Sequence, residues 1–293
     1  MLMEYVVGIG EALWDMLPTG RQIGGAPANF AYHAGHFGHR SYVVSAVGKD
    51  ELGDDLVSQL AEKKIDTIIP RVDFPTGTVE VTLSEGGIPH YRICEDVAWD
   101  NIPTSDELLS LAKDTVAVCF GSLAQRSAVS RAAIHRFLEA MPDNQRVLKV
   151  FDVNLRQKYY SRDVMEASLE YCNILKLNDE ELPVIVGMLG LAGDDDEEKC
   201  RGIMRRFNLR IVILTKGAVG SYVFDERETS FVETPKVEVA DTVGAGDSFT
   251  GAFVGSLLNG KSVRDAHRVA VRVSAYVCTR RGAMPEIPED LIR

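Results

Sequence analysis

The sequence predicts an α/β fold built on a mostly parallel central sheet. Short apolar runs alternate along the chain with segments in which apolar residues recur at helical spacing. Buried parallel strands read as continuous apolar runs and are commonly joined by helices. The predicted strands are 5–9, 42–47, 116–120, 147–151, 174–177 and 211–215, and the predicted helices are 28–38, 54–63, 127–140, 162–170, 196–207, 245–258 and 263–279.

Composition narrows the functional classes. The 293 residues are 45% hydrophobic and 26% charged, enough for one large core or for a core with a smaller appendage. A net charge of −11 argues against nucleic acid as a partner, because binding a phosphate backbone needs a basic face. The first apolar run lacks a basic segment before it and is broken by Glu4, Glu11 and Asp15, so we expect neither a signal peptide nor a membrane span. The five cysteines are scattered without CxxC spacing, and we expect buried, reduced thiols in a cytoplasmic protein.

One segment departs from this alternation of strands and helices. Residues 78–84 alternate apolar and polar side chains, the letters EGG at 85–87 supply a turn, and residues 90–95 follow. This pattern predicts a hairpin with one polar face. Inside a parallel α/β protein, we expect such a hairpin to be a lid or a dimer clasp. Trp99 follows the hairpin, and we expect it to pack in the core or to cover one face of a bound ligand.

The strongest chemical signal is the stretch DTVGAGDSFTGAF at 241–253. Gly244, Ala245 and Gly246 stand at the predicted start of a helix, where unpaired backbone N–H groups and the helix dipole attract an anion. Asp247 follows directly, within reach of a ligand whose phosphate binds there. Phosphoryl transfer needs a positioned nucleophile, an acceptor for its proton and stabilised phosphate charge. Asp247 therefore suits the role of base. The alternative is that Asp247 only stabilises the helix, because an acid in the first turn interacts favourably with the helix dipole.

This stretch resembles the C-terminal signature of ribokinase-like (phosphofructokinase B-type) carbohydrate kinases. The N-terminal signature of that family is also present, as GGAPANFAYHAGHFG at 24–38, and the resemblance covers almost the whole chain. It implies one three-layer α/β/α kinase domain over 1–293, with a β lid formed from about 12–24 and 74–102. It also implies ATP and Mg²⁺, K⁺ as in some members, and a homodimer paired through the lids. Gly244 and Gly246 would bind the phosphates of ATP.

Two N-terminal segments fit a sugar site. Gly24 and Gly25 let backbone approach a ligand, and Asn29 offers both a donor and an acceptor, as a polyol requires. Asp15 follows the first predicted strand at its carboxyl end, where open α/β sheets bind ligands. The resemblance assigns these residues to the sugar. A dinucleotide-binding fingerprint in VGIGEAL is disfavoured, because Leu13 stands where the third glycine belongs.

Polar residues also follow a predicted strand in the middle of the chain. Asp152, Asn154 and Arg156 belong to the segment FDVNLR at 151–156, which places them on the ligand side of the sheet. Arg156 would clamp a phosphate or the substrate. A structural salt bridge explains this arginine equally well.

The resemblance assigns further residues to the nucleotide side. Asn178 and Glu181 resemble the N-x-x-E element of the family, which implies that they organise water, phosphate and magnesium, with Glu181 acting on Mg²⁺ through water. Thr215, Gly217 and Gly220 resemble the strand and turn that contact the nucleotide. A plain β-turn is the alternative for the two glycines.

Cation binding has two candidate segments. Asp241, Val243 and the loop at 278–285, which contains Gly282, resemble the monovalent-cation site of some members. The three histidines between positions 33 and 39 recur every third residue, but no Cys or acid completes a ligand set, so we disfavour a metal there.

The sequence therefore predicts an ATP-dependent sugar kinase that phosphorylates a primary hydroxyl. The pairing of GEALWDMLP with GGAPAN resembles bacterial fructokinases and makes D-fructose the first choice. The alternatives are 2-keto-3-deoxygluconate, ribose or a nucleoside. A catalytically inactive sugar or nucleotide sensor is the rival from another class, and the intact Asp247 with its anion site counts against it.

Overall fold

The computed structural model describes residues 4–17, 20–83 and 89–292, with side chains for all of these except 81–83 and 89–91. Within this part of the chain, nine strands form one sheet in the order β15-β14-β13-β12-β11-β10-β1-β4-β6. Neighbours from β6 to β13 are parallel, and β14 and β15 add an antiparallel edge. The bounds are β1 Tyr5–Ile9, β4 Arg40–Val44, β6 Asp66–Ile68, β10 Thr115–Gly121, β11 Leu148–Asp152, β12 Ile174–Asn178, β13 Ile211–Thr215, β14 Gly220–Asp225 and β15 Thr229–Glu233.

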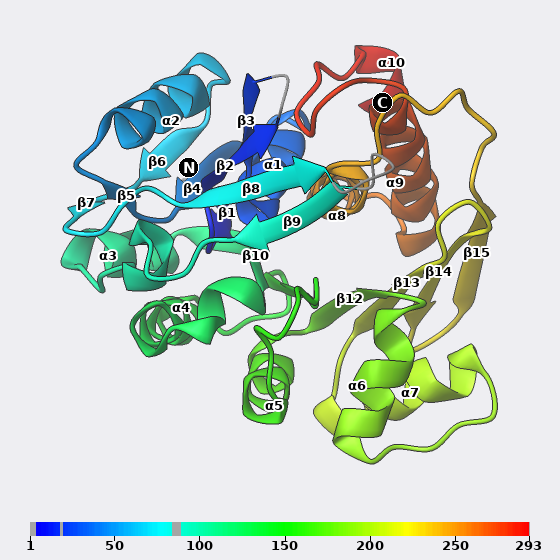
Figure 1. Cartoon of the computed structure of the whole chain (residues 1–293). Helices are drawn as coiled ribbons and strands as arrows, with labels where there is room; N and C mark the ends of the chain where they lie inside the picture. Colours follow the sequence, from blue (N-terminus) through cyan, green and yellow to red (C-terminus); the bar gives the residue numbers. More distant parts are fainter. Residues whose placement is uncertain (1–3, 18–19, 84–88, 293) are drawn as a thin grey trace.

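Helices cover both faces of this sheet (Figure 1), which confirms the three-layer α/β/α prediction. One apolar core joins the sheet to helices α3 to α7, and a second joins its other face to α1, α8 and α9. The bounds are α1 Ala26–Gly35, α2 Glu51–Glu62, α3 Asp106–Lys113, α4 Ala128–Ala140, α5 Arg162–Tyr171, α6 Glu181–Leu189, α7 Asp196–Phe207, α8 Ala245–Leu258, α9 Val263–Cys278 and α10 Glu289–Ile292. Single-turn helices η1 (Ala98–Asn101) and η2 (Leu123–Arg126) and the short pair β5 (Val47–Gly48) and β7 (Arg71–Val72) complete the described elements.

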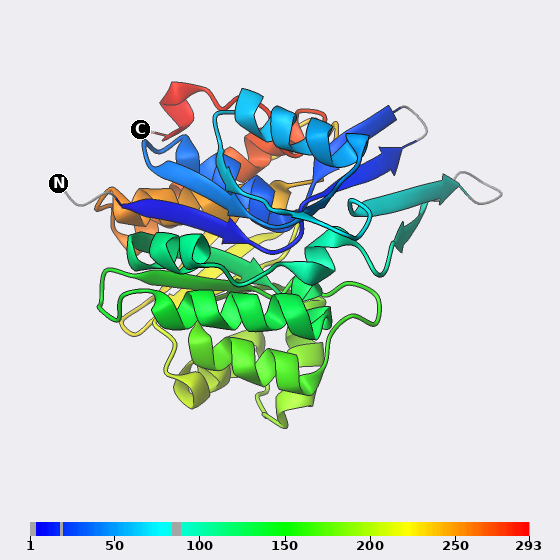
Figure 2. The same ribbon diagram turned by 90° about the vertical axis from the view of Figure 1, so that its left-hand side faces the viewer.

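A second sheet projects from the main body (Figure 2). In the described chain it has four strands in the order β3-β2-β8-β9, namely β3 Gly20–Gly24, β2 Leu13–Leu17, β8 Thr78–Leu83 and β9 Pro89–Ile93. β8 and β9 pair antiparallel, as the predicted hairpin requires. Val79 and Ile93 face each other and are buried against the core, while the predicted EGG turn and the side chains of Val81, Leu83 and Tyr91 lie outside the described residues.

Trp99 packs in the core, which is the first of its two expected roles. It is only 1% exposed and lies under Arg126, whose guanidinium is 4.0 Å from the indole centre, so the alternative of covering a ligand such as a sugar is excluded. Cys94 and Cys278 are partly exposed, so the prediction that every cysteine is buried was wrong for these two. In the described chain, none of the helices combines the length and the apolar character needed to cross a bilayer.

Candidate active site

The two signature segments meet at the first turns of helices α1 and α8. Asn29 lies in the first turn of α1, and its side-chain Nδ2 donates a hydrogen bond of 2.7 Å to Oδ2 of Asp247 in the first turn of α8. The helices pack closely because Gly251 has no side chain. A Cβ there would lie 2.9 Å from the carbonyl oxygen of Phe30. Residues 218 positions apart in the sequence thus form one site.

Asp247 has the properties of a tuned base. Burial, and then repulsion from Asp152, raise the pKa of its carboxyl to about 6, against the lowering effects of the Asn29 hydrogen bond, Lys176 and Arg156. At pH 7 and above the group is therefore mostly ionised and able to accept a proton.

The start of helix α8 is open to an anion. Gly244 has a left-handed φ of 76° at the N-cap, and among the described residues no side chain caps the helix there. A Cβ at Gly244 would lie 2.6 Å from the Cβ of Ala283, so only glycine fits. The N–H of Ala245 donates to the carbonyl oxygen of Thr242 at 3.3 Å, which leaves the N–H groups of Gly246 and Asp247 within the described chain for a ligand. Binding of a phosphate by the Gly244–Ala245–Gly246 stretch stays a prediction.

A buried ion pair beside this helix start was missed by the sequence reasoning. The ammonium of Lys176, on β12, lies 3.0 Å from each carboxylate oxygen of Asp152 at the end of β11. A Cβ on Gly246 would stand 2.8 Å from Nζ of Lys176. Lys176 is a single polar residue in an otherwise apolar strand, and this pattern does not indicate a site.

The predicted sugar end is built from β2 and the turn that leads into α1. Asp15 lies on β2, and the missing side chain of Gly24 lets its carboxylate approach, because a Cβ there would be 2.6 Å from Oδ2 of Asp15. Gly25 makes the turn with φ 115°, and a Cβ on it would be 2.3 Å from the carbonyl oxygen of Glu11. Burial raises the pKa of Asp15 to about 6, with Arg156 opposing the rise.

Glu11 is a second acid at this end that the sequence reasoning missed. Its side chain is 2% exposed, and its Oε2 atom has no hydrogen-bond partner in the described chain. Burial is the main cause that raises the pKa of Glu11 to about 7, and the charge of Asp247 adds to the rise, while hydrogen bonds from backbone, including Ala26 at the start of α1, oppose it. The letters GEALWD suggested only Asp15, because a glutamate between two strands has no distinctive spacing.

Arg156 faces these acids from the loop after β11. Its positive charge opposes the rise that burial causes in the pKa values of Glu11, Asp15 and Asp247. The guanidinium therefore lies near all three carboxyls. Its side chain is exposed. This position is compatible with the clamp, which stays a prediction.

Asn178 and Glu181 form a reciprocal hydrogen-bonded turn at the start of α6. Oδ1 of Asn178 accepts the backbone N–H of Glu181 at 2.8 Å, and Oε2 of Glu181 accepts the backbone N–H of Asn178 at 2.9 Å. Oε1 of Glu181 accepts the N–H of Leu155, also at 2.9 Å. The pair therefore holds the ends of β11 and β12 together beside the Lys176 ammonium, whose charge opposes the rise that burial causes in the pKa of Glu181.

The predicted nucleotide turn between β13 and β14 contains glycines of two kinds. Gly217 has φ 50° and open space around it, which leaves room for a ligand. A Cβ on Gly220 would lie 2.6 Å from the carbonyl oxygen of Val232, so β15 already requires this glycine. Thr215 ends β13 beside Leu177 of β12.

The residues of the predicted cation loop do come together. The carboxylate of Asp241 accepts backbone N–H groups from Val243 at 3.0 Å and from Gly282 at 3.1 Å. His33 binds the same loop, with Nε2 2.8 Å from the carbonyl oxygen of Ala283. Across residues 4–17, 20–83 and 89–292, no cluster of three or more His, Cys, Asp or Glu side chains is arranged to hold a metal ion.

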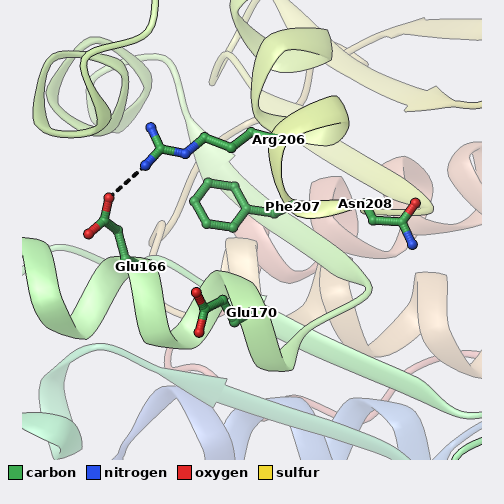
Figure 3. Close-up of a pocket in the computed structure, with 5 residues that line it drawn as sticks. All are labelled: Glu166, Glu170, Arg206, Phe207 and Asn208. Atoms are coloured by element: carbon green, nitrogen blue, oxygen red, sulfur yellow. Dashed lines mark hydrogen bonds and ion pairs between the residues drawn. The ribbon is translucent and has the colours of Figure 1, made fainter.

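A surface hollow of about 490 Å³ lies elsewhere, between α5 and the end of α7 (Figure 3). Glu166, Glu170, Arg206, Phe207 and Asn208 line it, and none of the predicted site residues does. Arg206 donates to Glu166 at 2.8 Å and to the carbonyl oxygen of Leu189 at 2.6 Å. Because this cation is already paired, the hollow is a poor candidate for the substrate site.

Comparison with known proteins shows the family of the chain. The chain matches the family model described as pfkB family carbohydrate kinase over residues 18–290. An ATP-dependent 6-phosphofructokinase of Thermoanaerobacterium thermosaccharolyticum is 29% identical, with 97% of this chain and 91% of that protein covered. Probable fructokinase-2 of Arabidopsis thaliana is 28% identical, with 97% and 93% covered. The crystal structure of a sugar kinase from Pyrococcus horikoshii in complex with ATP has a TM-score of 0.81 at 26% identity, covering 98% of this chain and 96% of that chain.

Proposed function

The chain belongs to the pfkB family of carbohydrate kinases, and we propose that it transfers the γ-phosphate of ATP to a primary hydroxyl of D-fructose. The observation that carries this proposal is the 2.7 Å hydrogen bond between Asn29 and Asp247, because it unites the sugar segment with the phosphate segment. The relatives named fructokinase support fructose as the acceptor, and the related sugar kinase solved with ATP supports the donor.

Asp247 acts as the base in this reaction. The acceptor hydroxyl loses its proton to the Asp247 carboxylate while its oxygen bonds to the γ-phosphorus. The bond between that phosphorus and the bridging oxygen of the β-phosphate breaks, and ADP leaves. The N–H groups at the start of α8, in the Gly244–Gly246 stretch, stabilise the negative charge on the transferred group.

The carboxyl groups of the site favour an uncharged acceptor. Glu11, Asp15 and Asp247 have raised pKa values, with burial as the first cause, and repulsion from another acid adds to each. A sugar phosphate, which the name of the 6-phosphofructokinase relative indicates, would bring further negative charge against these acids. A neutral sugar offers hydroxyl donors that carboxylates accept.

Asn29 and Asp15 hold the sugar. Oδ1 of Asn29 is buried and has no hydrogen-bond partner within the described residues, so a sugar hydroxyl would satisfy it. Asp15 supplies an acceptor from β2, and Gly24 and Gly25 keep the neighbouring backbone open. Arg156 clamps the substrate from the loop after β11.

The donor side uses Asn178, Glu181, Thr215 and Gly217, with Mg²⁺ accompanying the phosphates. Both oxygens of Glu181 accept backbone N–H groups at 2.9 Å, which fixes the carboxylate and leaves lone pairs for ordered water. This arrangement fits a magnesium ion that keeps its waters and touches Glu181 through them. The ion would neutralise charge on the phosphates.

A monovalent cation and a second subunit complete the proposal. Loops held together by Asp241, Val243 and Gly282 supply the backbone carbonyls that K⁺ prefers. The four-stranded sheet, within about 12–24 and 74–102 of a single domain over 1–293, closes over the sugar and pairs with its copy in a homodimer. Closure excludes water from the transfer, and pairing covers the strand edges. We place this reaction in the cytoplasm, where ATP is available.

A panel of sugars tests the function. Fructose, 2-keto-3-deoxygluconate, ribose and a nucleoside are each incubated with ATP and Mg²⁺, and ADP release is followed. Fructose should give the highest kcat/KM, and Asp247→Asn should bind sugar and ATP while losing at least ~10²-fold in turnover. Binding of ATP without turnover of any acceptor would favour the sensor instead, and near-normal turnover of Asp247→Asn would remove Asp247 from the mechanism.

A further inference from the structure

The buried ion pair of Lys176 and Asp152 lies where a phosphate would bind. Strands β11 and β12 are staggered so that Asp152, the last residue of β11, pairs directly with Lys176 on β12. Their side chains are 5% and 10% exposed, respectively. Removing two charges from water is costly, and hydrophobic residues of similar volume often replace such a pair without loss of stability. We therefore expect the pair to serve the function of the site rather than stability alone.

Lys176 also lies against the start of helix α8. The hydrogen that stands in place of a side chain on Gly246 leaves room for the ammonium, because a Cβ there would be 2.8 Å from Nζ. Burial lowers the pKa of Lys176, but charge interactions with Asp152, Glu181 and Asp247 together raise it above its ordinary value, so the ammonium stays charged. The cation thus adjoins the turn whose N–H groups face the anion.

The phosphate needs more positive charge than the helix supplies. A terminal phosphate carries about 1.5 to 2 negative charges near pH 7, whereas a helix N-terminus amounts to about half a positive charge. An ammonium has three N–H donors, and Asp152 is its hydrogen-bond partner among the described residues. A carboxylate with two oxygens leaves at least one of these donors for a ligand.

We propose that Lys176 is a catalytic residue that binds the γ-phosphate of ATP at the start of α8 and neutralises it during transfer. Asp152 holds the ammonium in place before ATP arrives and shares it afterwards. The lysine keeps its proton throughout, since the proton of the sugar hydroxyl goes to Asp247. This inference rests on the proposed function.

Relative affinity for ATP and ADP tests the contact directly, because ADP lacks the γ-phosphate. Calorimetry without sugar measures binding of ADP and of a non-hydrolysable β,γ-imido analogue of ATP, each with Mg²⁺. Lys176→Met should weaken binding of the analogue at least ~10-fold more than binding of ADP, and kcat with fructose should fall at least ~10²-fold. The matched control is Lys149→Met. Lys149 also interrupts an apolar strand, but its ammonium donates to the carbonyl oxygen of Leu138 at 2.8 Å, so the ratio of the two affinities should not change.

A second variant separates the contact from folding. Lys176→Met alone leaves Asp152 buried without its partner, which can unfold the chain. Asp152→Asn combined with Lys176→Met removes both charges and should remain folded by circular dichroism, yet keep the selective loss of ATP-analogue affinity. Recovery of wild-type affinity ratio and turnover in the double variant would overturn the proposal, because Lys176 would then serve only to neutralise Asp152. An equal loss of affinity for ADP and for the ATP analogue in both variants would overturn it as well.

Failure of the proposed function would look different. If the wild-type chain binds neither nucleotide, or binds both without phosphorylating any sugar, the kinase assignment fails. If the wild type phosphorylates fructose and Lys176→Met leaves the affinity ratio and kcat unchanged, only the role of Lys176 fails.

Discussion

Glu11→Gln should stabilise the ligand-free protein, and more so as the pH rises. The side chain of Glu11 is 2% exposed, and its Oε2 atom lacks a partner in the part of the chain that the structure describes. Glutamine has nearly the same shape and keeps a carbonyl oxygen for the backbone N–H of Ala26. It cannot ionise, so it removes the cost of holding a carboxylate beside Asp247.

The size of the effect follows from the pKa. Burial raises the pKa of Glu11 from 4.5 to about 7 in the folded chain, so the folded state keeps a proton that the unfolded state loses near pH 4.5. The stability that this proton contributes is complete below pH 4.5 and is lost as the pH rises to about 7. At about 1.4 kcal/mol for each pH unit, the loss reaches ~3 kcal/mol at pH 8 and remains below ~1 kcal/mol at pH 5.

Urea unfolding between pH 5 and pH 8 measures this difference. The free energy of unfolding of Glu11→Gln should exceed that of the wild type by an amount that grows by about 2 to 3 kcal/mol over the range. Glu226→Gln, in the exposed turn between β14 and β15, is the control for the substitution itself. A difference that stays constant with pH, or that grows toward low pH, would refute the reasoning.

Three further predictions concern activity and assembly. The rate kcat/KM should rise with pH through about 6 and fall about tenfold per unit below that value, because Asp247 must be ionised to accept a proton; a flat profile between pH 5 and 7 would contradict this. Asp15→Ala should weaken sugar use by roughly 1–3 kcal/mol while ATP affinity stays nearly unchanged. If calorimetry shows a larger loss of ATP affinity than of sugar affinity, the assignment of the two ends of the site is wrong. Replacing Val81 and Leu83, whose side chains lie outside the described residues, with Asp should disrupt the homodimer and sugar binding. Unchanged mass by light scattering together with unchanged sugar affinity would show that the hairpin is neither clasp nor lid.

An amphipathic pattern predicted some helices well but not all of them, since α3 (Asp106–Lys113), which also has one polar face, was missed. Helix 196–207 was placed at the observed bounds of α7, because an acidic N-terminus leads into an amphipathic pattern. Helix α6, Glu181–Leu189, was missed because its sequence ELPVIVGML is apolar almost throughout and contains Pro183. That proline is tolerated because it stands in the first turn, where its missing N–H is not needed. The antiparallel edge β14–β15 was also missed as a pair, since its strands carry mixed polarity.

The two signature segments predicted much of the site, because their glycines and acids have fixed spacing. The structure brings Asn29 and Asp247, one from each segment, into hydrogen-bond contact. Glu11 gave no such signal, because nothing in the letters GEALWD shows that the glutamate is buried beside a helix start. Its importance depends on the burial that raises its pKa, and burial of a single polar residue depends on the tertiary fold.

Lys176 shows why sequence pattern alone cannot identify every catalytic group. Lys149 and Lys176 each interrupt an apolar strand, in VLKVF and ILKL, so the two lysines are equivalent by pattern. Their environments differ because of register. Lys149 lies before Val150, the first β11 residue paired with β12, whereas Lys176 is paired with Asp152 at the end of β11 where parallel strands bind ligands. The stagger between two strands therefore brings one ammonium to Asp152 beside the start of α8 and leaves the other on a backbone carbonyl of α4. For this reason the Lys176→Met and Lys149→Met pair tests position rather than residue type.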